Sequence, residues 1–578
     1  MKRLLIKMFI ALITISVVIF VLLFEEFYDG YHGAINASEK VSTKNIVVPL
    51  AKNGFDWSLP ESTKKEPYSG LVDENDNSDL STQFVILRWD DTNPSRGKYD
   101  FSELTEKLKE VHPRNVLVRL DVNSLCEAPK WTLKKLRATK SNSLIFWDRS
   151  YLNLLKPYIY EFGKRFANHH QIVGVQVGIA DGEYKGSCDE NDNKDGWGEF
   201  WMSPQELAEA EKDFGLTPDI FLTRTKQIID IYVDAFKGNE AKLAFTNIDP
   251  FFSWDDISVV YDKKMPEISS YVMRQGLGSR DGNVEAWLRY VGTSYGIKYR
   301  LHKDGTCSMD MDESFARSIQ GRYWGTENEF YGIDDYILDY GGPIDNQSYR
   351  FLVSSLRALQ MRRNFMTVSS DGLKHVNHPD YKTKEFIEYL KNTMGKNIEN
   401  TTDVFVLLGE RYISSSSFSG VRKSDVDCIR DGKVSVRSFG RWMTEKSESV
   451  PAVKIKMPQS EKYWAQDIYL PSGYDYEYAA RSATHFYFDI NNELIRQRCN
   501  DKCNAEVKVT IKDNSKTNIN IKVSDVETQY FQSVGDGKIK TITFPITSKF
   551  NSEQGKDLII QSSSSAVSVL LVRVNFLQ

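Results

Sequence analysis

Between residues 81 and 400, short apolar runs alternate with longer segments whose apolar positions recur at helical spacing. This alternation is typical of βα units, in which helices cover a parallel sheet. The run over residues 172–179 is almost wholly apolar and β-branched, as expected for a strand buried on both faces. The predicted strands are 84–89, 115–121, 143–147, 172–179, 242–247, 271–274, 320–326 and 364–368. Eight strands over this length predict an α/β fold of the (β/α)8 TIM-barrel type, with insertions.

After residue 400 the pattern changes to short, often alternating apolar runs separated by Asn, Asp, Gly and Ser. No convincing helical pattern intervenes. The runs are 404–408, 434–437, 453–456, 485–490, 507–511, 519–523, 539–544 and 567–576. This pattern predicts an all-β sandwich over residues 401–578, following a barrel over residues 81–400.

The first 80 residues carry no barrel pattern. Residues 1–27 begin with three basic side chains and continue with an uncharged apolar run over residues 8–24. This arrangement fits a signal peptide or a single membrane helix, and the lack of a small-x-small cleavage site directly after it favours an uncleaved signal-anchor. We therefore expect the folded part outside the cytoplasm, with the helix as its contact to the membrane. The polar residues 28–80 are predicted to be a linker and leading loop.

Composition removes some classes of function. A formal net charge of −5 gives no basic excess that would hold nucleic acid. Six cysteines in 578 residues do not make a disulfide scaffold. Cys499 and Cys503 are close enough in the chain to bridge, and Cys126 and Cys188 both follow predicted strands, where an oxidised pair fits an extracytoplasmic location.

No metal or cofactor is predicted. The eight histidines are dispersed without metal-ligand spacing. The acidic loop 189–196 fits a calcium loop poorly, because Met202 stands where the bidentate Glu belongs. Asp310-Met-Asp312 resembles the DxD metal motif of glycosyltransferases, but no Gly-rich nucleotide-binding turn accompanies it.

Two predicted strands end in acidic side chains. Asp181-Gly-Glu183 follows the run 172–179, and Glu327-Asn-Glu329 follows the run 320–326. The carboxyl ends of parallel barrel strands meet at one mouth, where chemistry is done. Retaining glycoside hydrolysis needs one carboxylic acid and one carboxylate about 5–5.5 Å apart. Two strands can deliver such a pair across the mouth.

The region around these acids resembles a known family. Trp89 followed by Gly97-Lys-Tyr-Asp-Phe101 resembles the W…P…GxYDF pattern after the first barrel strand of clan A glycoside hydrolases, especially β-galactosidase-like and xylanase-like members. Ala128-Pro-Lys-Trp131 resembles their aPxW loop. Glu183 falls where these enzymes carry Asn-Glu after strand four, and Glu327 falls where they carry the nucleophile after strand seven.

This resemblance covers residues 81–400. It implies that Glu183 is the general acid/base and Glu327 the nucleophile, and the sandwich resembles the carbohydrate-binding accessory modules of such enzymes. The sequence departs from the family at Gly182, which replaces the Asn that binds the sugar 2-hydroxyl. Asp181 and Glu199 therefore compete for the acid role and Glu329 for the nucleophile role, and each could instead be a solvated loop residue.

Further side chains near predicted strand ends are candidates for substrate binding. The polar ones could bind hydroxyls or an acidic sugar, or could form structural ion pairs: Arg88, Arg119, Asp121, Asn247 and Arg274. Trp89, Trp131 and Trp324 are candidate stacking platforms for a sugar ring, with core packing as the other interpretation.

The sequence therefore predicts a retaining glycoside hydrolase acting on an extracytoplasmic polysaccharide or glycoconjugate. The alternative is a non-catalytic carbohydrate-binding surface protein built on a barrel, which the substitution at Gly182 would fit. A membrane-anchored glycosyltransferase comes third, and it would need sugar-nucleotide binding.

Overall fold

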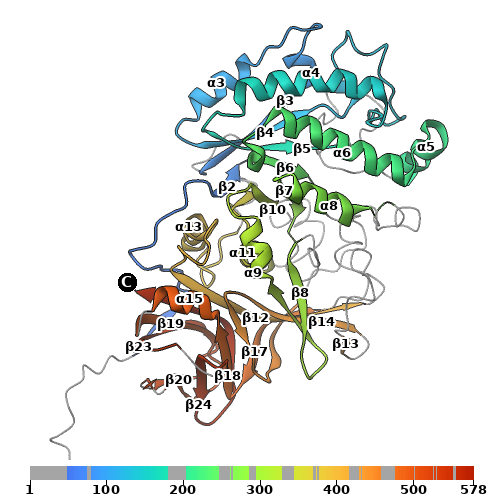
Figure 1. Ribbon diagram of the computed structural model, residues 1–578. Helices are drawn as coiled ribbons and strands as arrows, with labels where there is room; N and C mark the ends of the chain where they lie inside the picture. The colour runs from blue at the N-terminus through green and yellow to red at the C-terminus, as the bar shows by residue number, and fades with distance from the viewer. Residues whose placement is uncertain are drawn as a thin grey trace, which may run out of the picture. The chain divides into compact units, whose positions relative to one another are not determined.

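The computed structural model describes residues 49–73, 80–179, 204–246, 261, 264–284, 295–328, 344–368, 373, 376–414, 429–430, 433–456, 476–499, 502–524, 526–528, 530–550 and 555–577 (Figure 1). The chain divides into Met1–Val48 and Pro49–Gln578, and all described residues belong to the second unit. The predicted signal-anchor over residues 1–27 lies outside the described residues. Within them, no helix has both the length and the apolarity needed to span a bilayer.

Eight parallel strands form a closed barrel, which confirms the predicted TIM-barrel class. In chain order these strands are β2 (Gly70–Asp73), β3 (Thr82–Arg88), β4 (Asn115–Asp121), β5 (Ile172–Val177), β6 (Leu243–Thr246), β7 (Gly278–Asn283), β10 (Trp324–Glu327) and β11 (Phe365–Val368). The neighbours pair in parallel around the ring, and β11 closes it against β2.

Helices follow the strands and cover the barrel with their apolar stripes. Those of the barrel region are α2 (Trp89–Thr92), α3 (Ser102–Glu110), α4 (Arg149–Phe166), α5 (Pro204–Phe214), α6 (Pro218–Ala235), α8 (Met265–Arg274), α9 (Glu313–Ser318), α11 (Ile344–Gln360) and α13 (Thr383–Thr393). Their starts follow from local chemistry: the Thr217 side chain accepts a hydrogen bond from the Ile220 N–H, with Pro218 in the first turn of α6. Figure 1 shows α3, α4 and α6 on the side of the barrel away from the sandwich.

In the barrel region, three predicted elements differ from the structure. The first barrel strand, β2, has only four residues and lies inside the segment 28–80 that was predicted to be a linker. The predicted strand 143–147 is wrong: it is a loop, and its Ser143 hydroxyl donates to the buried Glu206 carboxylate (2.9 Å). The predicted strand 271–274 is also wrong, because it forms the end of α8 and the sixth strand begins at Gly278. The missed strand β2 and the false strand 143–147 both precede β5, so the numbering of the later strands is unchanged. β5 and β10 are therefore the fourth and seventh barrel strands, as predicted.

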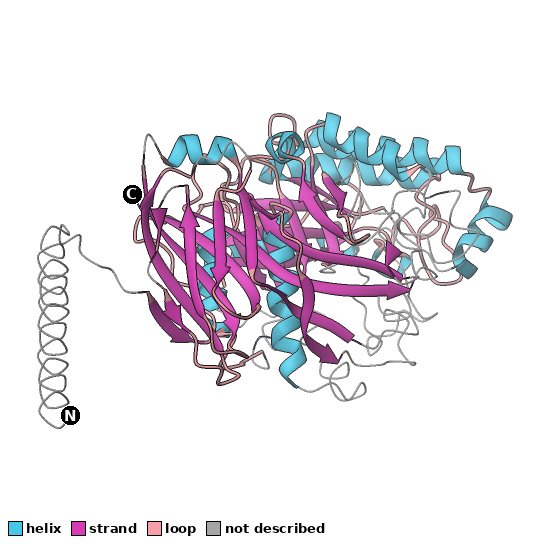
Figure 2. Cartoon of the chain, turned by 90° about the horizontal axis from the view of Figure 1, so that it is seen from below, coloured by secondary structure: helices cyan, strands magenta, loops and turns pink. Residues whose placement is uncertain are grey.

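Two mainly antiparallel sheets form the predicted sandwich, which is confirmed. The larger, eleven-stranded sheet contains β12 (Asp403–Ser414), β13 (Ile429–Arg430), β14 (Lys433–Arg441), β16 (Val450–Lys456), β17 (Tyr476–Ala483), β19 (Cys503–Lys512), β23 (Ile539–Ser548) and β25 (Val567–Leu577). The smaller, six-stranded sheet contains β15 (Met443–Glu445), β18 (His485–Ile490), β20 (Asn518–Val523), β21 (Val526–Glu527), β22 (Phe531–Gln532) and β24 (Leu558–Ser562). Figure 2 shows these strands side by side. A short helix, α15 (Asn492–Arg498), follows β18, so the expectation that no helix intervenes in this region is wrong; the Asn491 side chain caps it by accepting from the Glu493 and Leu494 N–H groups.

The larger sheet also takes strands from outside residues 401–578. β1 (Leu50–Asn53) pairs with β23, and the hairpin of β8 (Ile297–Leu301) and β9 (Cys307–Met311) joins at β14. Hydrogen bonds then tie barrel helices to the sandwich: the Tyr389 hydroxyl on α13 donates to Asp403 (2.7 Å), and the Tyr349 hydroxyl on α11 donates to Glu477 (2.7 Å). The barrel and the sandwich are therefore joined through buried side chains as well as by the chain itself.

Candidate active site

The inside of the barrel is closed below by Tyr323, the residue just before β10. A Cβ added at Gly174 or Gly325 would lie 2.5 Å from atoms of the Tyr323 ring, so the missing side chains on these strands leave the space that the ring fills. The ring stacks on Phe365 at a centroid distance of 4.7 Å. With Val72, Phe84, Leu117, Val173 and Ala244, these rings form an apolar floor inside the barrel.

A polar layer lies directly above this floor. Side chains two positions apart on a strand point to the same face. The residues two positions beyond Leu117, Gly174, Ala244, Gly278, Gly325 and Phe365 therefore also face the barrel interior. They are Arg119, Gln176, Thr246, Arg280, Glu327 and Thr367, one from each of the third to eighth strands, and each is at most 8% exposed. We call this set the inner polar layer.

Glu327 is the last residue of β10 and is buried at the carboxyl end of the barrel. Its carboxylate forms an ion pair with the guanidinium of Arg280 on β7, the neighbouring strand. A carboxylate buried in this way is tolerated only with a compensating charge, and a guanidinium stays charged at any working pH. The pair therefore presents an ionised, oriented carboxylate to the barrel interior, which is what a nucleophile in glycoside hydrolysis requires.

Arg119 and Asp121 form a second buried ion pair, on β4. The Arg119 Nε lies 2.7 Å from Asp121 Oδ1, and its Nη2 lies 3.4 Å from Oδ2. The guanidinium carbons of Arg119 and Arg280 lie 5.6 and 5.8 Å from the Phe84 ring centroid. Both predicted residues thus lie inside the barrel, and their charges are directed at each other.

Arg88, at the end of β3, is half-buried and holds the loop that follows β4. Its guanidinium donates to both oxygens of Asp90 (3.2 and 3.1 Å) and to the backbone oxygen of Cys126 (3.1 Å). Cys126 is itself disulfide-bonded. The contacts of Arg88 are therefore those of a loop anchor.

Two of the three predicted stacking platforms are closed to solvent. Trp89 is 0% exposed and packs against Tyr151 and Tyr158 of α4. Trp324 is 1% exposed, because Gly325 and Glu327 on the same strand face inward and Trp324 must face outward. For these two residues the stacking prediction is wrong. Trp131 is half-buried, and its indole N–H donates to the Asn93 backbone oxygen (3.0 Å).

The prediction that Arg274 lies at a strand end is wrong. Arg274 is the last residue of α8, in the outer helical ring, with its guanidinium carbon 5.8 Å from the Tyr271 ring centroid. The sixth strand instead contributes Arg280, which was missed because Gly278-Ser-Arg280 has no apolar run to mark a strand. Gln176 was missed too, although a single amide inside the apolar run 172–179 could have drawn attention to it.

Several predicted residues lie outside the described part of the chain: Asp181, Glu183, Glu199, Asn247 and Glu329. The Cys126–Cys188 pair also stays a prediction, whereas the Cys499–Cys503 disulfide is confirmed. Within the described residues, no three His, Cys, Asp or Glu side chains are grouped to hold a metal ion.

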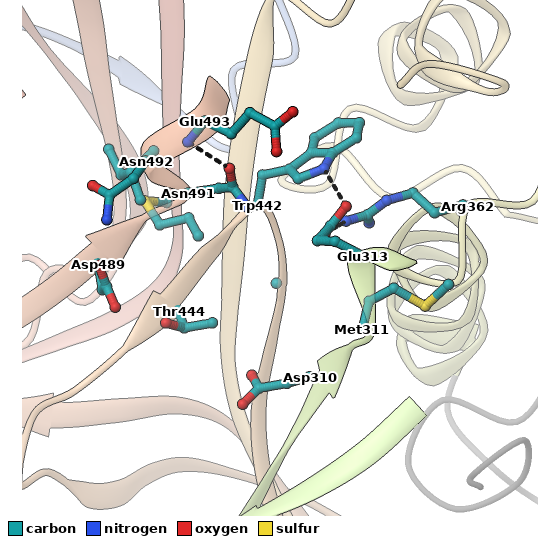
Figure 3. Close-up of a pocket in the computed structure, with 13 residues that line it drawn as sticks. Asp310, Met311, Glu313, Arg362, Trp442, Thr444, Asp489, Asn491, Asn492 and Glu493 are labelled. Atoms are coloured by element: carbon teal, nitrogen blue, oxygen red, sulfur yellow. Dashed lines mark hydrogen bonds and ion pairs between the residues drawn. The ribbon is translucent and has the colours of Figure 1, made fainter. Parts of the chain in front are cut away.

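A separate pocket of about 390 Å³ lies where the β8–β9 hairpin and α9 meet the sandwich (Figure 3). The Trp442 indole N–H donates to Glu313 (3.3 Å), which also pairs with Arg362. The other carboxylates lining the pocket have cationic partners as well: Asp310 with Arg300, Asp489 with Lys446 and Glu493 with Arg317. Since α9 leads into the amino end of β10, this pocket is distinct from the end of the barrel that holds Glu327.

Comparison with known proteins gives likeness among solved structures only. No protein-family model matches the chain, and no curated protein matches it. A β-galactosidase from the psychrophilic Marinomonas ef1 matches with 11% identity over 54% of this chain and 54% of that one, at a TM-score of 0.26. Endo-glycoceramidase II from Rhodococcus sp. matches with 9% identity over 81% of this chain and 89% of that one, at a TM-score of 0.27. Xylanase 10B from Thermotoga petrophila RKU-1 matches with 12% identity over 59% of this chain and 99% of that one, at a TM-score of 0.29.

The match thus spans about half the length of the Marinomonas enzyme. At such low identities and TM-scores, the functional proposal has to rest on the chain's own residues.

Proposed function

We propose that this protein is a retaining glycoside hydrolase acting on a polysaccharide or glycoconjugate outside the cytoplasm. One observation carries the proposal: Glu327 is a buried, charge-paired carboxylate at the carboxyl end of the seventh barrel strand, facing the barrel interior. The fourth strand ends at the same end of the barrel, and Glu183 follows it in the chain.

In the proposed reaction, the Glu327 carboxylate attacks the anomeric carbon while the Glu183 carboxylic acid protonates the departing glycosidic oxygen. The deprotonated Glu183 then takes a proton from water, which displaces Glu327 and restores both groups. Arg280 orients the nucleophile through the ion pair. Before attack, the Arg280 guanidinium neutralises the charge of the Glu327 carboxylate. Once Glu327 has formed the ester with the sugar, it carries no negative charge, and its ion pair with Arg280 weakens.

The oxidised cysteines support a location outside the cytoplasm. Cys126, Cys307, Cys499 and Cys503 are all in disulfide bonds, and disulfides persist in oxidising compartments. The apolar segment 8–24 would then anchor or export the chain. The sandwich would act as the accessory carbohydrate-binding module.

Non-catalytic carbohydrate binding is the second candidate, and Gly182 favours it. The resembled enzymes carry Asn at this position, and hydrogen bonds to the sugar 2-hydroxyl strengthen in the transition state, so a site without that amide would lose more catalysis than sugar binding. The two functions differ in turnover, so the same variants separate them.

The test begins with a screen of the protein against polysaccharides, with analysis of the products. Glu183→Gln and Glu327→Gln are then compared with Glu106→Gln, which changes an exposed carboxylate on α3. Loss of either catalytic group should lower kcat by on the order of a thousandfold, and the α3 variant should match the parent protein. Unchanged turnover in both catalytic variants would refute the assignment. Saccharide binding without hydrolysis in the parent protein would favour the second candidate.

A further inference from the structure

Three side chains of the inner polar layer keep buried polar atoms without a partner in the described part of the chain. They are the amide oxygen and nitrogen of Gln176 on β5, the hydroxyl of Thr246 on β6 and the hydroxyl of Thr367 on β11. Each of these residues is at most 1% exposed. Nearly all buried polar groups in folded proteins have a hydrogen-bond partner, so a cluster of exceptions requires an explanation.

The cluster lies beside the proposed nucleophile. Thr367 is the strand partner of Glu327, and Thr246 is the strand partner of Arg280. Gln176 precedes Thr246 around the barrel, on the strand that leads to Glu183. Consecutive strands β5, β6, β7, β10 and β11 therefore carry unpartnered neutral groups on both sides of the Arg280–Glu327 pair.

The described arginine side chains of the inner polar layer each already have a carboxylate partner. Arg119 is paired with Asp121, and Arg280 is paired with Glu327. These four formal charges cancel, so neither guanidinium has a charge to spare for an anionic ligand. Among the described residues of the inner polar layer, the side chains Gln176, Thr246 and Thr367 then remain as neutral donors and acceptors without a partner.

We propose that Gln176, Thr246 and Thr367 bind the hydroxyl groups of a neutral sugar unit in the barrel. An amide offers a donor and an acceptor side by side, which matches two adjacent hydroxyls, and each threonine hydroxyl can donate or accept. The reaction at this unit rests on the proposed function, but the binding does not. The same layer disfavours a uronic acid, because the carboxylate of that sugar would enter a site in which both guanidinium groups are already paired with carboxylates.

The chain offers a matched control for these variants. Thr225 on α6 is also 0% exposed and its hydroxyl also lacks a partner among the described residues, but it lies in the outer helical layer. Thr246→Val and Thr225→Val therefore remove the same atom from equally buried places. Removing a hydroxyl that has no protein partner should leave the melting temperature of both variants unchanged or slightly raised.

Binding is measured by calorimetry on the full-length parent protein, in which Glu327 keeps its ion pair with Arg280, with galactose, glucose, xylose and glucuronic acid as probes. These free monosaccharides have no glycosidic bond that the protein could cleave. We expect at least one neutral sugar to bind and glucuronic acid to bind more weakly. Adding Thr246→Val or Gln176→Leu should weaken neutral-sugar binding by on the order of tenfold, while Thr225→Val should leave it unchanged. Thr246→Ser, which keeps the hydroxyl, should bind like the parent.

Unchanged affinity in both Thr246→Val and Gln176→Leu would overturn the inference. So would tighter binding of glucuronic acid than of every neutral sugar, or no binding of any probe. A lowered melting temperature in Thr246→Val, absent in Thr225→Val, would show that the hydroxyl serves a protein partner and would also overturn it. Binding as expected, in a parent protein that hydrolyses no glycoside, would uphold the inference and refute the proposed function.

Discussion

Three buried tyrosines provide a direct test of what joins the barrel to the sandwich. Tyr389 and Tyr349 each donate a 2.7 Å hydrogen bond to a carboxylate of the sandwich, Asp403 and Glu477. Tyr323, in the barrel floor, is buried to the same degree, but its hydroxyl has no partner among the described residues. Burial raises the pKa of all three hydroxyls, so each stays protonated over the usable pH range.

The expected cost of each Tyr→Phe change follows from these contacts. A hydrogen bond to a charged group contributes about 1.5–3 kcal/mol, and its loss also leaves a buried carboxylate short of a donor. Tyr389→Phe and Tyr349→Phe should therefore each lower the free energy of unfolding by about 2–3 kcal/mol. Tyr323→Phe removes only an unsatisfied hydroxyl and should change it by less than about 0.5 kcal/mol.

Thermal melting of the three variants, followed by circular dichroism and fluorescence, measures the difference. We expect Tyr389→Phe and Tyr349→Phe to melt several degrees below the parent, and Tyr323→Phe to melt with it. Equal losses at all three positions would mean that tyrosine packing, and not the hydrogen bond to the sandwich, sets the stability. No loss at Tyr389 and Tyr349 would show that these bonds do not join the two parts.

Two further predictions concern packing and pH. Gly174→Ala would place a Cβ 2.5 Å from the rigid Tyr323 ring and should cost about 1–3 kcal/mol, seen as a lower urea midpoint; an unchanged midpoint would contradict the tight floor. Burial, together with nearby guanidinium groups, lowers the pKa of His302 from 6.5 to about 3, so the unfolded chain binds the proton first and stability should fall as the pH drops from 6.5 toward 3. Melting temperatures across this range should fall less in His302→Gln than in the parent or in exposed His170→Gln, and parallel curves would contradict the prediction.

The sequence predicted the architecture because long-range burial leaves local patterns. Continuous apolar runs marked β4 and β5, and the change to alternating runs marked the sandwich. The apolar pattern failed where it was weak, or where it fits both a strand and a buried loop. β2 has four residues, and the apolar run around Phe146 looks like a strand although it packs into the core with only isolated β-bridges and belongs to no sheet.

The site was predicted less completely than the fold. Glu327 stood out as an acid after an apolar run, and the structure places it inside the barrel. Its partner Arg280 is far away in the chain and follows no apolar run, so only closure of the barrel brings the two together. The alternation along β10 was available from the sequence and would have placed Trp324 outside once Glu327 was placed inside.

The most direct test of the central claim is to trap the nucleophile. The protein is incubated with an activated 2-deoxy-2-fluoro glycoside of the sugar that it hydrolyses, digested, and the labelled peptide is identified by mass spectrometry. The account predicts a covalent sugar on Glu327, absent from Glu327→Gln, and a product that keeps the anomeric configuration. A label on Glu329 or on any other residue, or a product of inverted configuration, would contradict it.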